Sequence, residues 1–192
     1  MTETVRQLDI QRRGGICATA PTACMVFDLL REANIRPKQV TVLDLTYGEG
    51  RFWLAARPRL LIGADVAVHE WLEKPDIFIP RPAWQAWRIV KELSIDVDVV
   101  AVDPPWIARG SARRRHFGLD MAIGGPRLIL MAAEEAAWRL GAQYILVHYK
   151  ERWIPKGYTV LVEKEWQPWG RYINLNKESP TTWWAVLAAS KG

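Results

Sequence analysis

Cysteine is scarce, long apolar runs are missing, and neither sign of charge dominates in this chain of 192 residues. The two cysteines, Cys17 and Cys24, are too few for a zinc site or a disulfide-stapled fold, so we expect two small buried thiols in a reducing, cytoplasmic setting. No stretch approaches the roughly 20 apolar residues that cross a bilayer, so we expect no membrane contact. Residues 1–9 lack the apolar core of a secretory signal peptide.

The chain does have enough apolar sequence for one core, and it is rich in tryptophan. Hydrophobic residues make up 49% of the sequence, which fits one globular domain over residues 1–192 and excludes a disordered chain. The 26 basic and 21 acidic side chains leave a net charge of +5, which permits a polyanionic partner without requiring one. Tryptophan accounts for 11 residues, and an indole outside the core could stack on a nucleobase.

Short β-branched runs alternate with helical stretches along the chain. Strands are expected over residues 40–45, 60–65, 77–79, 97–102, 144–149, 158–163 and 183–188. Helices are expected over residues 23–31, 51–57, 83–93 and 126–140. The alternation predicts a single-domain α/β fold with a doubly wound, mostly parallel seven-stranded sheet whose last strands are antiparallel.

A glycine-containing turn, Asp44-Leu45-Thr46-Tyr47-Gly48-Glu49-Gly50, follows the first expected strand. Ligands of open α/β sheets bind beyond the carboxyl ends of strands, and glycines let a backbone approach them closely. A nicotinamide dinucleotide is disfavoured because Trp53 occupies the position at which its fingerprint needs a third glycine. Asp65 ends the second expected strand, where it either accepts hydrogen bonds from a ribose diol or is an ordinary capping acid.

A second motif, Asp103-Pro104-Pro105-Trp106, follows the clearest central strand. The two prolines end the strand and fix the backbone, which holds the Asp103 carboxylate and the Pro104 carbonyl near one pocket. Two adjacent acceptors suit a group with two N–H donors, such as an exocyclic amine, and Trp106 offers a flat face to a planar ring. The alternative is a strand-ending loop whose aspartate makes a local cap.

Together these motifs resemble those of the Rossmann-type S-adenosylmethionine-dependent methyltransferases that modify amino groups. The glycine turn resembles their cofactor-binding turn, and Asp103-Pro104-Pro105-Trp106 resembles their D/N/S-P-P-Y/F/W motif. With Asp65 and the alternating elements, the resemblance covers most of the chain. This branch includes DNA N6-adenine and N4-cytosine methyltransferases and RNA enzymes that act on adenine, cytosine or guanine N2. The resemblance implies a Rossmann-like fold and S-adenosyl-L-methionine as the cofactor.

The resemblance also implies roles for individual residues. The cofactor-binding residues would be Thr19, Pro21, Asp44, Thr46, Tyr47, Gly48, Gly50 and Asp65. The catalytic residues would be Asp103, Pro104, Pro105 and Trp106, and residues 1–39 would form a helical region that closes over the methionine end of the cofactor. Two departures stand out. Thr46 replaces the usual glycine or phenylalanine, and Pro80-Arg81-Pro82 replaces an acid that often contacts the cofactor adenine, so no residue is assigned to that contact.

The implied reaction is direct methyl transfer to an exocyclic amine, with Asp103 and the Pro104 carbonyl holding the amine hydrogens. Adenine N6 is the first candidate because the motif begins with aspartate, and cytosine N4 and guanine N2 remain open. No metal is needed, and neither cysteine is placed to attack a pyrimidine. A protein or small-molecule amide methyltransferase and a non-catalytic nucleic-acid-binding module are the alternatives from other classes.

A basic loop follows the second motif and suits contact with the phosphates of DNA or RNA, although a solvated charged loop is the plain alternative. Its candidate nucleic-acid-binding residues are Arg109, Arg113, Arg114, Arg115 and His116. Trp166 or Trp169 is a candidate for base stacking, whereas the adjacent Trp183 and Trp184 should pack on opposite faces of the sheet. His69, His116 and His148 lack metal-binding spacing and are expected to be structural or surface residues. With little room for a target-recognition domain, specificity would come from loops, a homodimer or partner subunit, or a structured RNA.

Overall fold

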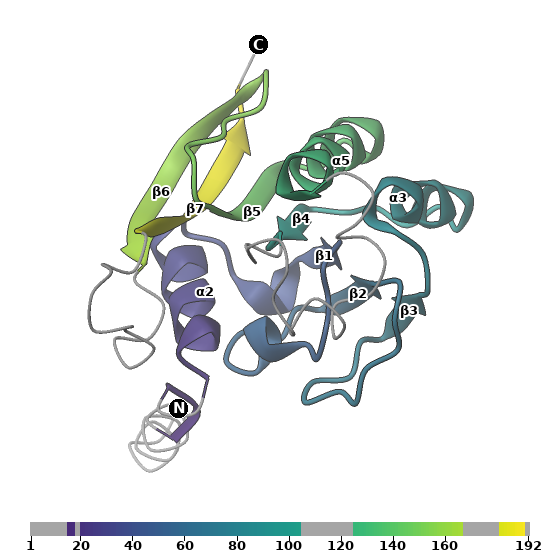
Figure 1. The fold of residues 1–192 in the computed structure, drawn as a ribbon, viewed down its shortest axis with the longest axis horizontal. Coiled ribbons are helices and arrows are strands. Elements are labelled where there is room, and N and C mark those ends of the chain that lie inside the picture. Colours follow the sequence, from purple (N-terminus) through teal and green to yellow (C-terminus); the bar gives the residue numbers. More distant parts are fainter. Residues whose placement is uncertain (1–14, 18–19, 105–124, 167–180, 191–192) are drawn as a thin grey trace.

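Seven strands form one sheet in the order β3-β2-β1-β4-β5-β7-β6 (Figure 1). The computed structural model describes residues 15–17, 20–104, 125–166 and 181–190. Within them the strands are β1 Thr41–Asp44, β2 Leu60–Ala64, β3 Ile77–Ile79, β4 Val99–Val102, β5 Tyr144–Tyr149, β6 Tyr158–Trp166 and β7 Thr182–Ala189. The first five strands are parallel, and β7 runs antiparallel to both β5 and β6. This is the α/β, Rossmann-like arrangement that the sequence predicts.

Helices cover both faces of the sheet, with α3 and α5 on one face and α2 on the other (Figure 1). Their bounds are α2 Pro21–Glu32, α3 Ala83–Glu92 and α5 Gly125–Leu140, with 3₁₀ turns η1 Pro37–Gln39 and η2 Arg51–Trp53. The predicted helix over residues 51–57 is wrong, because only the turn η2 forms there. Trp53 points into the core and Pro58 disfavours a helical conformation at the residue before it, so the segment cannot continue as a helix.

Burial explains why these short strands hold together. All four residues of β1 and all four of β4 are buried, as expected of parallel strands covered on both faces. Four alanines of α5, Ala132, Ala133, Ala136 and Ala137, are buried and let this helix approach the sheet closely. The core thereby fixes the carboxyl ends of β1, β4 and β5 next to one another.

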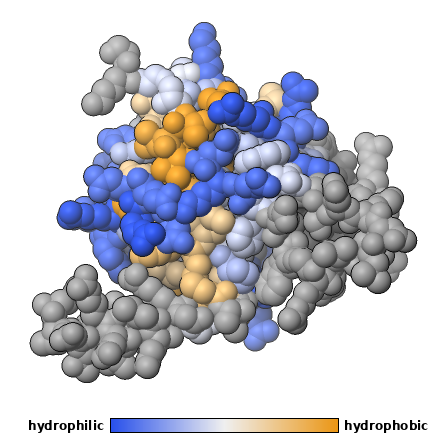
Figure 2. Space-filling model, turned by 90° about the vertical axis from the view of Figure 1, so that its left-hand side faces the viewer, coloured by the Kyte–Doolittle hydropathy of each residue, from blue (hydrophilic) through white to orange (hydrophobic). Residues whose placement is uncertain are grey.

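The two adjacent tryptophans of β7 point to opposite faces of the sheet, as predicted. Trp183 packs against the cluster under α3 and α5, and Trp184 is buried in the cluster under α2. The outer strand β6 alternates half-buried and exposed residues and leaves its other edge unpaired among the described strands. Hydrophilic side chains surround a smaller apolar area on the left-hand side of the molecule, where β6 lies (Figure 2). Charged residues on an edge strand discourage pairing with another sheet.

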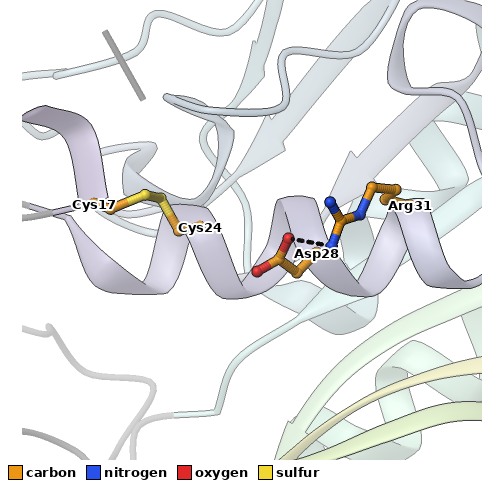
Figure 3. Close-up of a disulfide and its surroundings, with 4 residues drawn as sticks. All are labelled: Cys17, Cys24, Asp28 and Arg31. Carbon is orange, nitrogen blue, oxygen red and sulfur yellow. Dashed lines mark ion pairs between the residues drawn. A yellow bond between two sulfur atoms is a disulfide. The ribbon is translucent and has the colours of Figure 1, made fainter. Parts of the chain in front are cut away.

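The prediction of two free, buried thiols is wrong. Cys17 and Cys24 form a disulfide with a Cα–Cα distance of 5.6 Å, and both are only half-buried. Cys24 lies on α2 one turn before Asp28, which forms an ion pair of 3.1 Å with Arg31 on the same helix (Figure 3). The bond ties residues 15–17 to the start of α2. No helix in the described part of the chain is both long and apolar enough to cross a membrane.

Candidate functional site

The glycine turn and the proline-containing corner lie side by side at the carboxyl ends of β1 and β4. These strands are parallel neighbours, with Asp44 opposite Ala101. The backbone N–H of Asp103 donates a hydrogen bond of 2.8 Å to Thr46 Oγ1. Thr46, the residue that departs from the family pattern, therefore joins the two motifs with a group that glycine or phenylalanine could not supply.

Tyr47 fills the inner side of the glycine turn. Its hydroxyl donates to the Glu73 carbonyl at 2.6 Å, and its ring lies where a Cβ on Gly63 would be only 2.5 Å away. A Cβ on Gly50, which has φ +77°, would meet both the Glu73 carbonyl and the Tyr47 hydroxyl. Gly48 differs: its φ is +54°, but apart from its two chain neighbours no atom of the described residues lies within 4 Å of the position a Cβ would take. The turn is thus packed at Gly50 and open at Gly48.

Asp44 supports the turn from inside the protein. Its carboxylate is fully buried and accepts hydrogen bonds from Trp53 Nε1 at 2.8 Å and from the Thr46 backbone N–H at 3.0 Å. Burial raises the pKa of Asp44 to about 7, and the Trp53 and Thr46 hydrogen bonds oppose this rise. Through these contacts Asp44 supports the shape of the turn.

Asp65 lies just beyond β2 and faces the open side of the turn. One carboxylate oxygen accepts the Gly48 backbone N–H at 2.9 Å, and the other accepts that of Ala67 at 3.1 Å. His69 Nε2 is 3.6 Å from the same carboxylate. These contacts fix an acidic side chain beside Gly48, where a hydroxyl-bearing ligand would find an acceptor.

Asp103 is paired with a histidine that the sequence-based prediction treats as structural. The Asp103 Oδ1 atom lies 2.6 Å from His148 Nδ1, and His148 Nε2 lies 2.8 Å from Thr182 Oγ1. The side chain of His148 is 11% exposed and that of Asp103 is 28% exposed. The signal for this pair is the strand register: Val102 lies opposite Val147, so the next residue of each strand, Asp103 and His148, are neighbours.

The other predicted site residues fall into two groups. Pro104 is buried after β4, Pro21 is the first residue of α2, and Trp166 is partly buried against the cluster under α2. Outside the described residues lie Thr19, Pro105, Trp106, Trp169, Arg109, Arg113, Arg114, Arg115 and His116. Within the described ranges, no group of three His, Cys, Asp or Glu side chains is arranged to hold a metal ion.

Comparison with solved structures identifies the fold. No protein-family model matches the sequence, and no curated protein is significantly similar to it. A Pyrococcus horikoshii protein provisionally assigned as an RNA methyltransferase matches with a TM-score of 0.56 and 14% identity, over 88% of this chain and 83% of that chain. A Streptococcus pneumoniae protein provisionally assigned as a tRNA (m1A22) methyltransferase, solved with S-adenosyl-L-methionine, matches with a TM-score of 0.51 and 13% identity, over 86% of this chain and 73% of its own.

A third solved structure, assigned as a methyltransferase and complexed with SAH, has a TM-score of 0.55 and 11% identity. The match covers 82% of this chain and 47% of that one. Identities this low establish a shared fold, and a fold hosts many functions, so the function must be argued from the site. The chain has the fold of Rossmann-type methyltransferases.

Proposed function

We propose that this protein is an S-adenosylmethionine-dependent methyltransferase that acts on an exocyclic amine of a nucleobase in RNA or DNA, with adenine N6 as the first candidate. The observation that carries the proposal is the hydrogen bond from the Asp103 backbone to Thr46. It joins an acidic corner to a glycine turn at the strand ends where α/β folds bind ligands.

The residues of the turn fit the cofactor. Space beside Gly48 allows close approach of a ligand, and Asp65 offers carboxylate oxygens suited to a ribose diol. Thr46, Tyr47, Gly50 and Asp44 shape the turn, while Thr19 and Pro21 belong to the proposed closing segment. When bound, the cofactor supplies an electrophilic methyl carbon on a sulfonium. The complexes of two structurally similar proteins, one with S-adenosyl-L-methionine and one with SAH, support this choice of cofactor.

Asp103 is proposed to hold the amine for reaction. Its Oδ1 atom is engaged by His148, whereas Oδ2 has no hydrogen-bond partner among the described residues and the side chain is 28% exposed. Oδ2 can therefore accept one amine hydrogen, and the Pro104 carbonyl is proposed to accept the other. As the new N–C bond forms and the methyl–sulfur bond breaks, the nitrogen would become positively charged, and it would return to neutrality by giving a proton to Oδ2. Trp106 is proposed to stack on the base.

A nucleic-acid substrate is supported by the net charge of +5 and by the arginines proposed to contact phosphates, Arg109, Arg113, Arg114 and Arg115, with His116 beside them. The assigned RNA substrates of structurally similar proteins point the same way. The Cys17–Cys24 disulfide removes the ground on which the sequence suggests a reducing, cytoplasmic setting. A homodimer or a partner subunit is proposed to assist target recognition.

Two measurements on the full chain test this function. Calorimetric titration with SAH should show binding, and labelled-methyl transfer to transfer RNA, ribosomal RNA, DNA and protein should identify the polymer. Nucleoside analysis should then find the methyl group on an exocyclic nitrogen. The Asp103→Ala variant should bind SAH as the wild type does and transfer no methyl group. Methyl groups on a ring nitrogen, or on protein, would overturn the substrate assignment, and SAH binding without transfer to any polymer would favour a non-catalytic binding module.

A further inference from the structure

We propose that His148 is the positioning residue for Asp103, and that a hydrogen bond from its Nδ1–H group holds one carboxylate oxygen and so aims the other at the substrate amine. The inference rests on the proposed function, because it concerns the same carboxylate. His148 does not reach the substrate: it acts through Asp103.

Thr182 holds the far side of the His148 ring. Its Oγ1 atom lies 2.8 Å from His148 Nε2 and 2.9 Å from the Trp166 carbonyl oxygen. These contacts connect the ring to β7 and to the end of β6, and they hold Nδ1 toward Asp103.

Asp103 lies at the other ring nitrogen. Its Oδ1 atom is 2.6 Å from His148 Nδ1. Because a carboxylate oxygen accepts hydrogen bonds, Nδ1 is the donor of this contact and holds Oδ1 in place.

The surroundings of the ring fix its plane. His148 stacks on Trp184 with the ring centroids 4.6 Å apart and the planes within 3° of parallel. Phe52 packs edge-on against Trp184, and β7 pairs His148 with Trp184 in register, so the platform is fixed by the sheet.

The consequence for the reaction is a carboxylate with one oxygen held and one oxygen available. The Nδ1–H group fixes Oδ1, and the Thr46 hydrogen bond fixes the backbone of the same residue. Oδ2 is thereby aimed, and it takes the proton that the methylated amine releases while Nδ1–H stays on Oδ1. Loss of this orientation should lower kcat with little effect on cofactor binding, because alignment matters most in the transition state.

Two substitutions separate the roles of the ring nitrogens. In His148→Asn the amide N–H can take the place of Nδ1–H, whereas in His148→Gln it can take the place of Nε2–H. We expect His148→Gln to lose about 100-fold in kcat with an unchanged SAH affinity, and His148→Asn to keep most of the activity. Equal kcat values for the two variants, with wild-type transfer intact, would overturn the positioning role.

Nitrogen NMR of the histidine side chains provides a readout that needs no substrate. Nδ1 of His148 should appear protonated and hydrogen-bonded in the wild type, and this hydrogen bond should be lost in Asp103→Ala. An Nδ1 atom without a proton in the wild type would refute the hydrogen bond to Oδ1. If the wild type transfers no methyl group but the NMR result holds, the proposed function fails while the hydrogen-bonded pair stands, so the two failures are distinguishable.

Discussion

Replacing Thr46 with valine should separate the glycine turn from the Asp103 corner. Valine has nearly the shape of threonine, so the substitution removes the hydroxyl and little else. The Asp103 backbone N–H then loses its acceptor at 2.8 Å, in a partly buried place. A hydrogen bond of this kind contributes about 0.5–1.5 kcal/mol of folding free energy, and we expect a loss in that range from Thr46→Val.

The same substitution should reduce catalysis more than cofactor binding. Without the hydrogen bond the backbone of Asp103 is free to move, and a displacement of about 1 Å can lower a rate by about 100-fold. Thr46→Ser is the matched control, because it keeps the oxygen and removes only the methyl group. Urea unfolding and methyl-transfer kinetics of both variants would measure the two effects. If Thr46→Val matches Thr46→Ser in stability and in kcat, the hydrogen bond does not hold the site together.

Three further predictions concern the packing of the turn and the start of α2. The pKa of Asp44 is raised from 3.8 to about 7, so the folded protein binds this proton more tightly than the unfolded chain does. The stability gained from the protonated, uncharged side chain should therefore be lost as pH rises from about 4 to 7. Relative to Asp44→Asn, the wild type should lose about 3 kcal/mol of unfolding free energy over that range, and parallel pH profiles would contradict this. Gly63→Ala should lower the free energy of unfolding by about 1–3 kcal/mol, because its Cβ would overlap a tyrosine ring. Gly48→Ala should be less destabilising, because the only cost is a positive φ at a residue with a side chain. A lower melting temperature for Gly48→Ala than for Gly63→Ala would be inconsistent with this packing. Reduction of the disulfide between Cys17 and Cys24 should lower the free energy of unfolding by about 2.5 kcal/mol, and replacement of both cysteines by serine should have the same effect. A wild-type melting temperature that does not respond to reductant would show that the disulfide does not stabilise the fold.

Much of the fold follows from the sequence because the hydrophobic pattern of each element is strong. Strands β1 and β4 are short continuous apolar runs that end at an acid, and helices α3 and α5 have clear helical spacing. The helix expected over residues 51–57 fails because Trp53 is drawn into the core, where its indole donates to Asp44. Pro58 is the local signal against a helical conformation at Arg57, whereas the burial of Trp53 depends on residues that are distant in sequence.

Less of the site follows from the sequence, because its contacts depend on which residues lie close together in the folded protein. The two motifs can be placed at the same sheet edge from the sequence, but the Thr46 hydrogen bond depends on which strands are neighbours. His148 was assigned a structural role because its sequence neighbours offer no metal-binding pattern, whereas its partner is set by strand register. The disulfide was missed because a spacing of seven residues between Cys17 and Cys24 does not itself indicate a bond.

The measurement that tests the account most directly is a crystal structure of this protein with SAH. Our account predicts that the ribose hydroxyls lie within hydrogen-bond distance of Asp65, with the backbone of Gly48 against the ligand. It also predicts that the sulfur atom faces the Oδ2 side of Asp103, with space for an amine between them. A ligand bound at another edge of the sheet, or a sulfur atom turned away from Asp103, would contradict the proposed methyl transfer.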